Sequence, residues 1–423
     1  MSVLILHRNP FEPFPYGRWL ADYPGGIVVL AAHDKLVAFG EQVPTGEHGF
    51  AHLEVLGDFE DEELVLARAL KLAEKFAVRH IVAHHEGDVI LAAWLRERMG
   101  LPGAWTADVL PFRDKALMKE RLEQAGIEVA RYTVPQNAAE ALAFADRHGF
   151  PLVLKERAGF NSIGLRILRD RDELLSHAAR EFADAPRDDL ILESFVPGRM
   201  CHVDGLVRDG RTAVAWPSQY QYDLASYGSD PGARVDLTLD PDDPLTQRLL
   251  SLTNRVLAAL RQPEGRLQDH GFHAEIFHTP DDRLVVCEIA CRPGGAKVRE
   301  VFHTLFGYNL GEYATRAGVG LPLPLLEPNR HAGARPRPLS MAGQVLMMKR
   351  PGQVRSLPAV PDDPWVERFW LYGRVGQVIP QASGSSDFLT CAVASAPTRA
   401  ECESRLRDLG ARFEAQTEIT VTP

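Results

Sequence analysis

Hydrophobic positions change their period several times along the first hundred residues. Apolar runs at residues 2–7 (SVLILH) and 25–32 (GGIVVLAA) predict β-strands, and residues 61–78 (DEELVLARALKLAEKFAV) have the amphipathic pattern of a helix. The apolar run at residues 80–84 (HIVAH) predicts the next strand. This order of strands and helix predicts a small parallel sheet of the βαβ type.

A helix predicted over residues 86–103 (EGDVILAAWLRERMGLPG) is closed by Gly100, and we place the first domain boundary near residue 105. The next unit begins with Asp114, which can cap a helix that ends at Gly126.

Two further helices in this unit have the spacing of a capping box at their starts, where Asn137 precedes Glu140 and Asp170 precedes Glu173. Between them, residues 151–168 (PLVLKERAGFNSIGLRIL) predict two strands joined by a glycine-containing loop.

The middle of the chain predicts strands, a loop and a helix. Residues 190–208 (LILESFVPGRMCHVDGLVR) predict a strand, a Pro-Gly bend and another strand, and the polar aromatic segment 216–233 predicts a loop. Residues 242–262 repeat apolar positions at the spacing of one helix face.

Proline and arginine crowd together in residues 318–338, which we interpret as a linker. The tail from about residue 336 predicts strands at 342–349 and 388–395, a helix at 398–410 and a last strand at 412–421 (RFEAQTEITV).

Two apolar runs carry a glutamate each, Glu275 in FHAEIF and Glu288 in LVVCEIA. Strand alternation puts His273 and Glu275 on one face, and puts Glu288 on one face with Val286 and Ala290. If the runs pair as a hairpin, both carboxylates lie side by side, where they repel unless a cation such as Mg²⁺ binds between them. The alternative is that each glutamate pairs with an arginine on a solvated face.

Size and composition narrow the function classes. The 423 residues suffice for two or three domains, and 45% hydrophobic with 25% charged residues is typical of soluble proteins. No apolar run reaches the roughly 18 residues of a membrane span. A net charge of −10 argues against a nucleic-acid surface, because phosphate backbones require clustered cations.

The chain start and the cysteines favour a cytoplasmic protein. The first apolar run lacks a preceding basic region and predicts a first strand, not a signal peptide. The five cysteines are odd in number and scattered, which suits a reducing compartment. Cys287 and Cys291 lack the companions of a zinc site, so we interpret them as buried apolar residues.

Cations and glycines in the second unit point to phosphate binding. Lys155 ends an apolar strand just before the loop with Gly159, Ser162 and Gly164, where backbone N–H groups can approach phosphate oxygens. Lys115, near a helix start, is a poor partner for the helix dipole, which hints at an anionic ligand. Glu193 ends a strand that could offer backbone groups to a flat ring.

Taken in order, five segments resemble the ATP-grasp superfamily, in particular its carboxylate–amine ligases of the L-amino-acid ligase type. The segments are DKALMKERLEQAGI (114–127), PLVLKERAGFNSIGL (151–165), LILESFVPGRMCHVDGLVRDG (190–210), GFHAEIF (271–277) and VVCEIACRPGG (285–295). The resemblance covers about residues 106–320 by motif, and the flanks fit by size and order.

The resemblance implies an α/β (α+β) architecture, the ATP-grasp fold. Its expected parts are an N-terminal Rossmann-like pre-ATP-grasp domain (1–105), an ATP-grasp subdomain with the glycine lid loop (106–190), a second subdomain with the metal site (191–330) and a small C-terminal α+β domain (336–423).

The resemblance also implies a role for each matching residue. ATP and Mg²⁺, with Mn²⁺ as an alternative, are the expected cofactors. Lys115 and Lys155 would hold nucleotide phosphates under the loop of Gly159, Ser162 and Gly164; Glu193, Phe195 and Val196 would bind adenine; Glu275 and Glu288 would hold the metal; Arg292 would bind the substrate carboxylate or its acyl phosphate.

Two positions depart from the family pattern. Met200 stands where many relatives have a ribose-binding glutamate, so His202 or Asp204 would take that role. Ala290 stands where many have an asparagine metal ligand, so a water or another ligand would fill that coordination place.

Other polar residues have alternative interpretations. His84, His85 and Glu86 end a predicted strand, where ligands often bind, yet a structural or interdomain role is the stronger reading. Tyr220 and Tyr222 could line an acceptor pocket or pack as anchors.

The predicted function is therefore ATP-dependent ligation of a small carboxylic acid to an amine, expected to be an amino acid, through an acyl phosphate. The same fold with another acceptor, such as bicarbonate, and a nucleotide-binding regulator without turnover are the alternatives. Neither nucleic acid nor membrane is an expected partner, and a homodimer is compatible with the resemblance.

Overall fold

The computed structural model describes residues 1–423 except 39, 46–47, 184, 263, 327–335 and 421–423. Part of the predicted linker at 318–338 therefore lies outside the described residues. Within the described part of the chain, no helix has both the length and the apolar character needed to cross a bilayer.

The N-terminal part forms a parallel four-stranded sheet in the order β3-β2-β1-β4, as the strand and helix pattern predicted. Its strands are β1 (Ser2–His7), β2 (Gly26–Ala32), β3 (His52–Leu56) and β4 (Val78–Ala83). Alternating residues of β1 enter different cores: Leu4 and Leu6 join one cluster, and Val3 and Ile5 join another. Both sheet faces are thus covered, which explains why these strands are continuously apolar.

Short helices accompany this sheet and lead away from it. They are α1 (Tyr16–Trp19), α2 (His33–Ala38), α3 (Glu62–Lys75), the 3-10 turn η1 (Glu86–Asp88), α4 (Val89–Met99) and α5 (Thr106–Arg113). Gly100 ends α4 in the left-handed conformation, with φ of 64°, as predicted.

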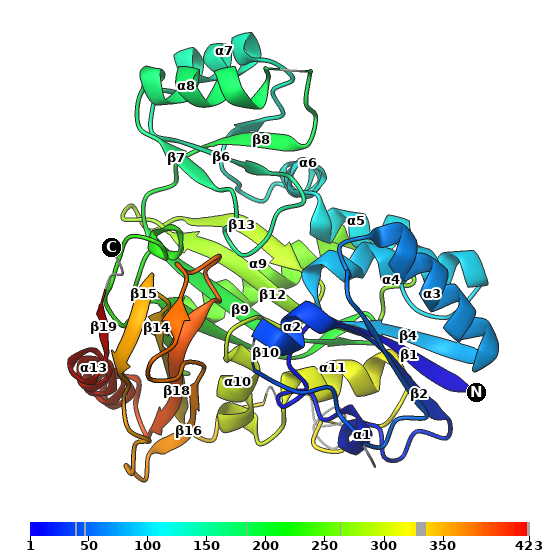
Figure 1. Ribbon diagram of the computed structural model, residues 1–423. Coiled ribbons are helices and arrows are strands. Elements are labelled where there is room, and N and C mark those ends of the chain that lie inside the picture. The colour runs from blue at the N-terminus through cyan, green and yellow to red at the C-terminus, as the bar shows by residue number, and fades with distance from the viewer. Residues whose placement is uncertain (39, 46–47, 184, 263, 327–335, 421–423) are drawn as a thin grey trace.

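The second part is a small lobe at the top of Figure 1. Its antiparallel sheet has the order β5-β8-β6-β7, with β5 (Tyr132–Thr133), β6 (Leu152–Glu156), β7 (Arg166–Leu168) and β8 (Leu190–Ser194). Helices α7 (Ala138–His148) and α8 (Arg171–Glu181) pack on it, and their N-caps are Asn137 and Asp170 as the sequence predicted. Before this lobe, Asp114 caps α6 (Lys115–Gln124) by accepting bonds from the N–H groups of Ala116 and Leu117.

An antiparallel eight-stranded sheet forms the body, in the order β13-β12-β9-β10-β11-β14-β18-β16. Its strands are β9 (Arg199–Arg208), β10 (Arg211–Tyr220), β11 (Arg234–Thr238), β12 (His270–His278), β13 (Leu284–Ala290), β14 (Met341–Met348), β16 (Val366–Leu371) and β18 (Phe388–Ala396). The C-terminal strands β14, β16 and β18 thus continue the same sheet as the strands of the middle of the chain.

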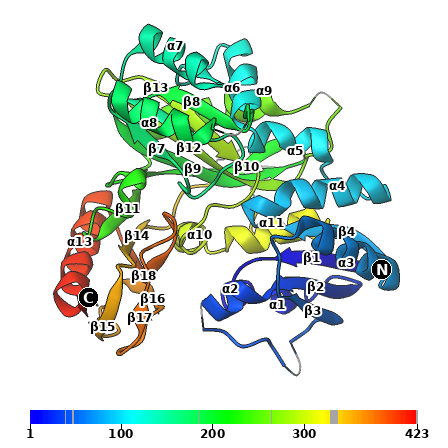
Figure 2. The same ribbon diagram turned by 45° about the horizontal axis from the view of Figure 1, so that its top comes forward.

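Helices cover this sheet and join it to its neighbours. α9 (Pro244–Leu260) packs on β9, β12 and β13, α13 (Arg399–Gln416) packs on β11 and β14, and α10 (Val298–Phe306) with α11 (Leu310–Gly318) covers further apolar side chains. A small sheet of β17 (Val378–Ile379), β15 (Gly352–Ser356) and β19 (Glu418–Thr420) adjoins the C-terminal part. Figures 1 and 2 both place the N-terminal sheet and the C-terminal strands on opposite sides below the lobe.

Two predicted segments differ from the structure. Residues 216–220, predicted as loop, complete β10, because their backbone pairs with β9 and β11 on both sides. Residues 412–416, predicted as strand, extend α13, because Phe413 continues its buried apolar stripe; only β19 at residues 418–420 is extended.

The packing of α9 can be tested by comparing two leucines of that helix. Leu249 is fully buried against the sheet, whereas Leu257 is only partly buried. Leu249→Ala should lower the free energy of unfolding by about 2–5 kcal/mol, and Leu257→Ala by clearly less. Urea denaturation measures both values, and equal losses would contradict the described face of α9.

Candidate active site

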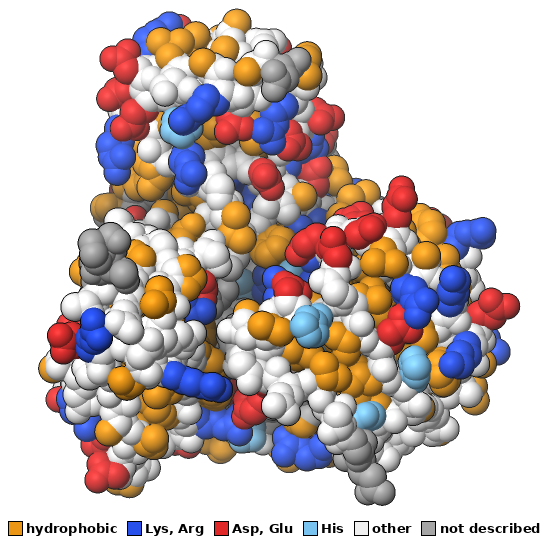
Figure 3. Space-filling view, viewed as in Figure 1, with side chains coloured by type: hydrophobic (Ala, Val, Ile, Leu, Met, Phe, Trp, Pro, Cys, Tyr) orange, Lys and Arg blue, Asp and Glu red, His pale blue; other side chains and the backbone are white. Residues whose placement is uncertain are grey.

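A cavity of about 440 Å³ lies between the lobe and the eight-stranded sheet. Figure 3 shows this face hollowed below the upper lobe. The cavity is lined by strands of both sheets and by the loop between β6 and β7, whose Gly159, Ser162 and Gly164 were predicted to cover phosphates. Of the predicted site residues it also includes Lys115, Lys155, Glu193, Phe195, Val196, Glu275 and Glu288.

Glu275 and Glu288 lie directly opposite each other on β12 and β13, as the predicted hairpin requires. The register shifts after Glu275, so that Ile276 faces Val286 and Cys287 is the extra residue of the bulge. Val286 therefore enters the core with Ile276, whereas Glu288 lines the cavity. The prediction that Glu288 and Val286 share a face was wrong, because the bulge interrupts simple alternation.

Lys115 stands over Glu288. Its Nζ lies 3.1 Å from Glu288 Oε2 and donates a 2.6 Å bond to the carbonyl oxygen of Gly159 in the loop above. Burial opposes ionisation of Glu288, yet Lys115 and Lys155 hold the pKa of this carboxyl down at about 2. Glu288 is therefore an anion at neutral pH, in a cavity that also presents a lysine.

Glu193 lies between two lysines instead of facing open space. Its carboxylate oxygens are 3.3 Å from Lys119 Nζ and 3.2 Å from Lys155 Nζ. Burial opposes the charge of Glu193, but the two lysines lower the pKa of its carboxyl, and Glu193 raises the pKa of Lys155. The predicted adenine contact of Glu193 thus competes with an ion pair that positions Lys155.

Lys119 was missed from the sequence, although its side chain is fully buried. The available signal was its spacing: Lys119 is one helical turn after Lys115, so both point from the same face of α6.

Phe195 and Val196 line the cavity just beyond Glu193, where β8 ends. The Phe195 N–H is taken by the carbonyl of Pro151, and the Phe195 side chain is 39% exposed. Met200, which replaces the expected glutamate, also lines the cavity. Phe195, Val196 and Met200 thus give this part of the cavity an apolar surface on which a flat ring could pack.

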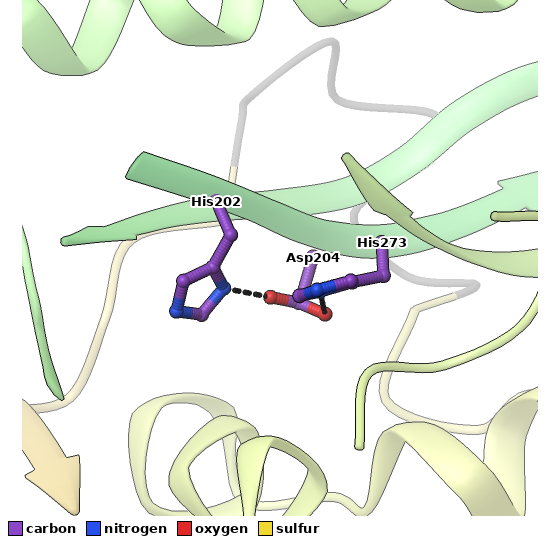
Figure 4. Close-up of side chains that lie close together, drawn as sticks. All are labelled: His202, Asp204 and His273. Atoms are coloured by element: carbon purple, nitrogen blue, oxygen red, sulfur yellow. Dashed lines mark hydrogen bonds and ion pairs between the residues drawn. The ribbon is translucent and has the colours of Figure 1, made fainter. Parts of the chain in front are cut away.

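His202 and Asp204 are not among the residues that line the cavity; they lie in a buried chain of hydrogen bonds (Figure 4). Asp204 joins His202 Nδ1 at 2.5 Å and His273 Nδ1 at 2.9 Å, and His202 Nε2 lies 3.0 Å from Asp236. Every side-chain polar atom of His202 and Asp204 is therefore engaged. This geometry does not support the prediction that one of them binds a ribose, because both are buried and neither lines the cavity.

The ionisable side chains in this hydrogen-bonded network shift one another's pKa values. Burial disfavours a charged ring, but the carboxylate of Asp204 outweighs it and raises the pKa of His273 to about 9. Asp236 and Asp204 likewise raise the pKa of His202 well above its ordinary value. Two histidine rings thus alternate with two aspartate side chains along this network.

Among the described residues, His202, Asp204 and His273 are the one cluster of three side chains whose possible metal-ligand atoms lie close together. Metal binding requires a free ring nitrogen, and both nitrogens of His202 face carboxylates. A charge-balanced network explains this cluster better than a metal site does.

Arg292 lies two residues beyond the end of β13 and is not among the residues that line the cavity. It forms an ion pair with Glu86, which also accepts a 2.7 Å bond from Arg113. Burial opposes its charge, but Glu86 raises the pKa of Arg292 above the ordinary value. Glu86 thereby joins the N-terminal part to the site, as the interdomain interpretation of residues 84–86 expected.

Ala290 offers no ligand atom, and it faces His273 across the strand pair. The facing carboxylates of this strand pair that line the cavity are those of Glu275 and Glu288. Two ionisable oxygens beside lysines suit Mg²⁺ that is shared with substrate phosphates, because Mg²⁺ binds through few carboxylates and keeps other ligands.

The chain is similar to known proteins both in sequence and in structure. Residues 114–215 match the family model described as the carbamoyl-phosphate synthase L chain, ATP binding domain. The chain is 24% identical over 280 residues to an L-arginine-specific L-amino acid ligase of Bacillus subtilis. The matched region covers 65% of this chain and 66% of that ligase, just under two thirds of its length.

Solved structures are similar over the whole chain. An L-amino acid ligase from Bacillus licheniformis superposes with a TM-score of 0.77 at 19% identity, covering 100% of this chain and 99% of the other. The biotin carboxylase domain of a Hydrogenobacter thermophilus 2-oxoglutarate carboxylase, solved with MgADP and bicarbonate, superposes with a TM-score of 0.69 at 17% identity, covering 99% of this chain and 90% of the other. These structural similarities confirm the predicted ATP-grasp fold.

Proposed function

We propose that this protein is an ATP-dependent ligase that activates a small carboxylic acid as an acyl phosphate and transfers the acyl group to an amine, releasing ADP and phosphate. The observation that carries the proposal is the facing pair Glu275 and Glu288 on the cavity wall, with Lys115 3.1 Å from Glu288. The similarity to two L-amino acid ligases supports amino acids as substrates.

The cavity residues supply charge and position. Lys115 and Lys155 would neutralise the nucleotide phosphates, and Phe195 and Val196 would pack against the adenine. Glu275 and Glu288 would hold Mg²⁺, which when bound neutralises charge on the transferring phosphoryl group. No side chain needs to become covalently attached, because phosphoryl transfer depends mainly on positioning and electrostatic stabilisation.

Arg292 would bind the substrate carboxylate. A guanidinium presents two parallel donors to a carboxylate or acyl phosphate, and Glu86 holds Arg292 in one orientation. The amine would then add to the acyl carbon, phosphate would leave, and the developing oxyanion would face Arg292.

The proposed activity can be tested by a screen. Pairs of the twenty common amino acids, beginning with L-arginine as the acid, are incubated with ATP and MgCl₂, phosphate release is recorded, and products are weighed by mass spectrometry. An amide formed with stoichiometric phosphate supports the ligase. Turnover only with bicarbonate would favour a carboxylase, and nucleotide binding without turnover under any condition would favour a regulator.

Glu288→Ala should lower kcat by about a thousandfold or more, because it removes half of the proposed metal site and leaves Lys115 without its carboxylate. Steady-state phosphate release measures the change, and circular dichroism checks the fold. Glu63→Ala, at an exposed position in α3, is the control and should retain wild-type kcat. A Glu288→Ala enzyme with near-normal, magnesium-dependent turnover would refute the metal assignment.

Arg292→Ala should lower kcat/KM for the acid by about a hundredfold or more and change the KM for ATP little, since the lost contact is to the carboxylate. Arg292→Lys keeps the positive charge but loses the paired donors of the guanidinium, so its kcat/KM for the acid should lie between the wild-type and Arg292→Ala values. Initial rates against each substrate separate the effects. Unchanged acid kinetics in Arg292→Ala would show that the acid binds elsewhere.

A further inference from the structure

The loop that covers the cavity, residues 157–165 between β6 and β7, leans on parts of the chain outside its own lobe. Its tip is formed by Asn161 and Ser162, both left-handed with φ of 60° and 56°. This tight turn projects the Asn161 side chain away from the lobe and toward the C-terminal part, to residues more than 220 positions later.

Asn161 binds the loop of residues 383–387, which we call the serine loop. Its Oδ1 accepts three hydrogen bonds, from Ser386 N at 3.0 Å, Ser386 Oγ at 2.6 Å and Ser385 Oγ at 3.0 Å. The backbone carbonyl oxygen of Asn161 accepts a fourth hydrogen bond, from Ser385 N at 3.2 Å. One residue of the covering loop thus receives four donors from one short segment.

The serine loop is braced to receive this side chain. Asp387 accepts bonds from the N–H and hydroxyl of Ser383, and it pairs with Lys349 at 2.6 Å. Gly384 leaves the space that Asn161 occupies: a Cβ there would lie 2.4 Å from Asn161 Nδ2 and 3.0 Å from its Cγ. Gly384 has no left-handed φ, so the close approach of Asn161 is the reason for a residue without a side chain.

The neighbouring residue Phe160 contacts the opposite flank. Its ring meets His85 edge to face at 5.3 Å, and Arg113 lies over it at 5.9 Å. Arg113 also donates a 2.6 Å hydrogen bond to the backbone carbonyl oxygen of Ala158 and forms an ion pair with Glu86. The covering loop is therefore fastened on two sides, by Phe160 to the N-terminal part and by Asn161 to the C-terminal part.

We propose that Asn161, Ser385 and Ser386 form a latch that holds the covering loop closed while the acyl phosphate exists, so that the amine and not water reacts with it. These three are positioning residues, since they act through the loop that carries Gly159 and Ser162. The inference rests on the proposed ligase activity for its chemical consequence, but the latch itself is a property of the loop.

An open latch has a defined chemical result. Water adds to the acyl carbon in place of the amine, the acyl–oxygen bond to phosphate breaks, and the original acid is regenerated. The net reaction is ATP and water to ADP and phosphate, with no amide. Latch variants should therefore release more phosphate per amide formed, whereas a general loss of activity would lower both together.

Four variants and one control test the latch. Asn161→Ala removes all three side-chain contacts, and Ser385→Ala/Ser386→Ala removes both hydroxyl donors. Gly384→Ala leaves every donor in place but pushes Asn161 away. Asn161→Asp keeps an oxygen that accepts the same bonds and should restore the latch. Gly57→Ala is the glycine control, because a Cβ there meets nothing within 4 Å.

The direct measurement is hydrogen exchange of the amides of residues 159–164, in the free protein and with Mg²⁺ and a non-hydrolysable ATP analogue. Asn161→Ala and Gly384→Ala should exchange about tenfold faster or more, because several hydrogen bonds oppose opening in the wild type. Asn161→Asp and Gly57→Ala should stay close to wild type. Unchanged exchange in both Asn161→Ala and Gly384→Ala would overturn the latch.

The second measurement is the ratio of phosphate to amide. We expect a ratio near one in the wild type and a clear rise in Asn161→Ala, in Gly384→Ala and in the double serine variant. Faster exchange with an unchanged ratio would overturn the role in protecting the acyl phosphate. If the wild type forms no amide with any acid and amine, the proposed function fails, while the exchange result still decides the latch.

Discussion

Two carboxylates facing each other on neighbouring strands are the constraint on which the rest of this site depends. Glu275 and Glu288 are adjacent in the sheet, and Glu288 is kept ionised, so their repulsion must be offset by cations. The protein supplies Lys115 at 3.1 Å from Glu288, and His273 at 3.4 Å from Glu275. Under the proposed function, a bound Mg²⁺ would offset the remaining negative charge of the pair.

The balancing of charge continues outward from this pair. Glu193 lies between Lys119 and Lys155 on one side, and His273, Asp204, His202 and Asp236 alternate in sign on the other. A buried charge without a partner is costly, so each ion fixes the position of the next. This network holds Lys155 and the two glutamates in place before a nucleotide binds, and preorganised charge is what phosphoryl transfer requires.

Features that depend on local sequence were predictable. The caps Asp114, Asn137 and Asp170 and the hairpin that carries the two glutamates follow from spacing and alternation, and the structure confirms them. The bulge at Cys287 was not predictable, because it depends on how β13 fits β12 and leaves no mark in the apolar pattern. The extension of β10 was missed for a similar reason: polar and aromatic residues look like a loop until strands pair on both sides.

Contacts between distant residues account for most of what the sequence left out. Lys119 meets Glu193 and Arg292 meets Glu86 across long stretches of chain, and neither pair has a local signature. The buried chain of His202 and Asp204 likewise needs Asp236 from another strand. The resemblance to the ATP-grasp superfamily suggested a ribose contact for these two, whereas the structure engages both of them with buried side-chain partners.

The central claim, that an acyl phosphate forms in this cavity, is tested most directly by following an oxygen atom. An acid that supports turnover is labelled with ¹⁸O in its carboxylate and converted with ATP and the amine. Because one carboxylate oxygen attacks the γ-phosphorus and leaves with it, the account predicts one ¹⁸O atom in the released phosphate for each amide formed. Amide formation with unlabelled phosphate would contradict it.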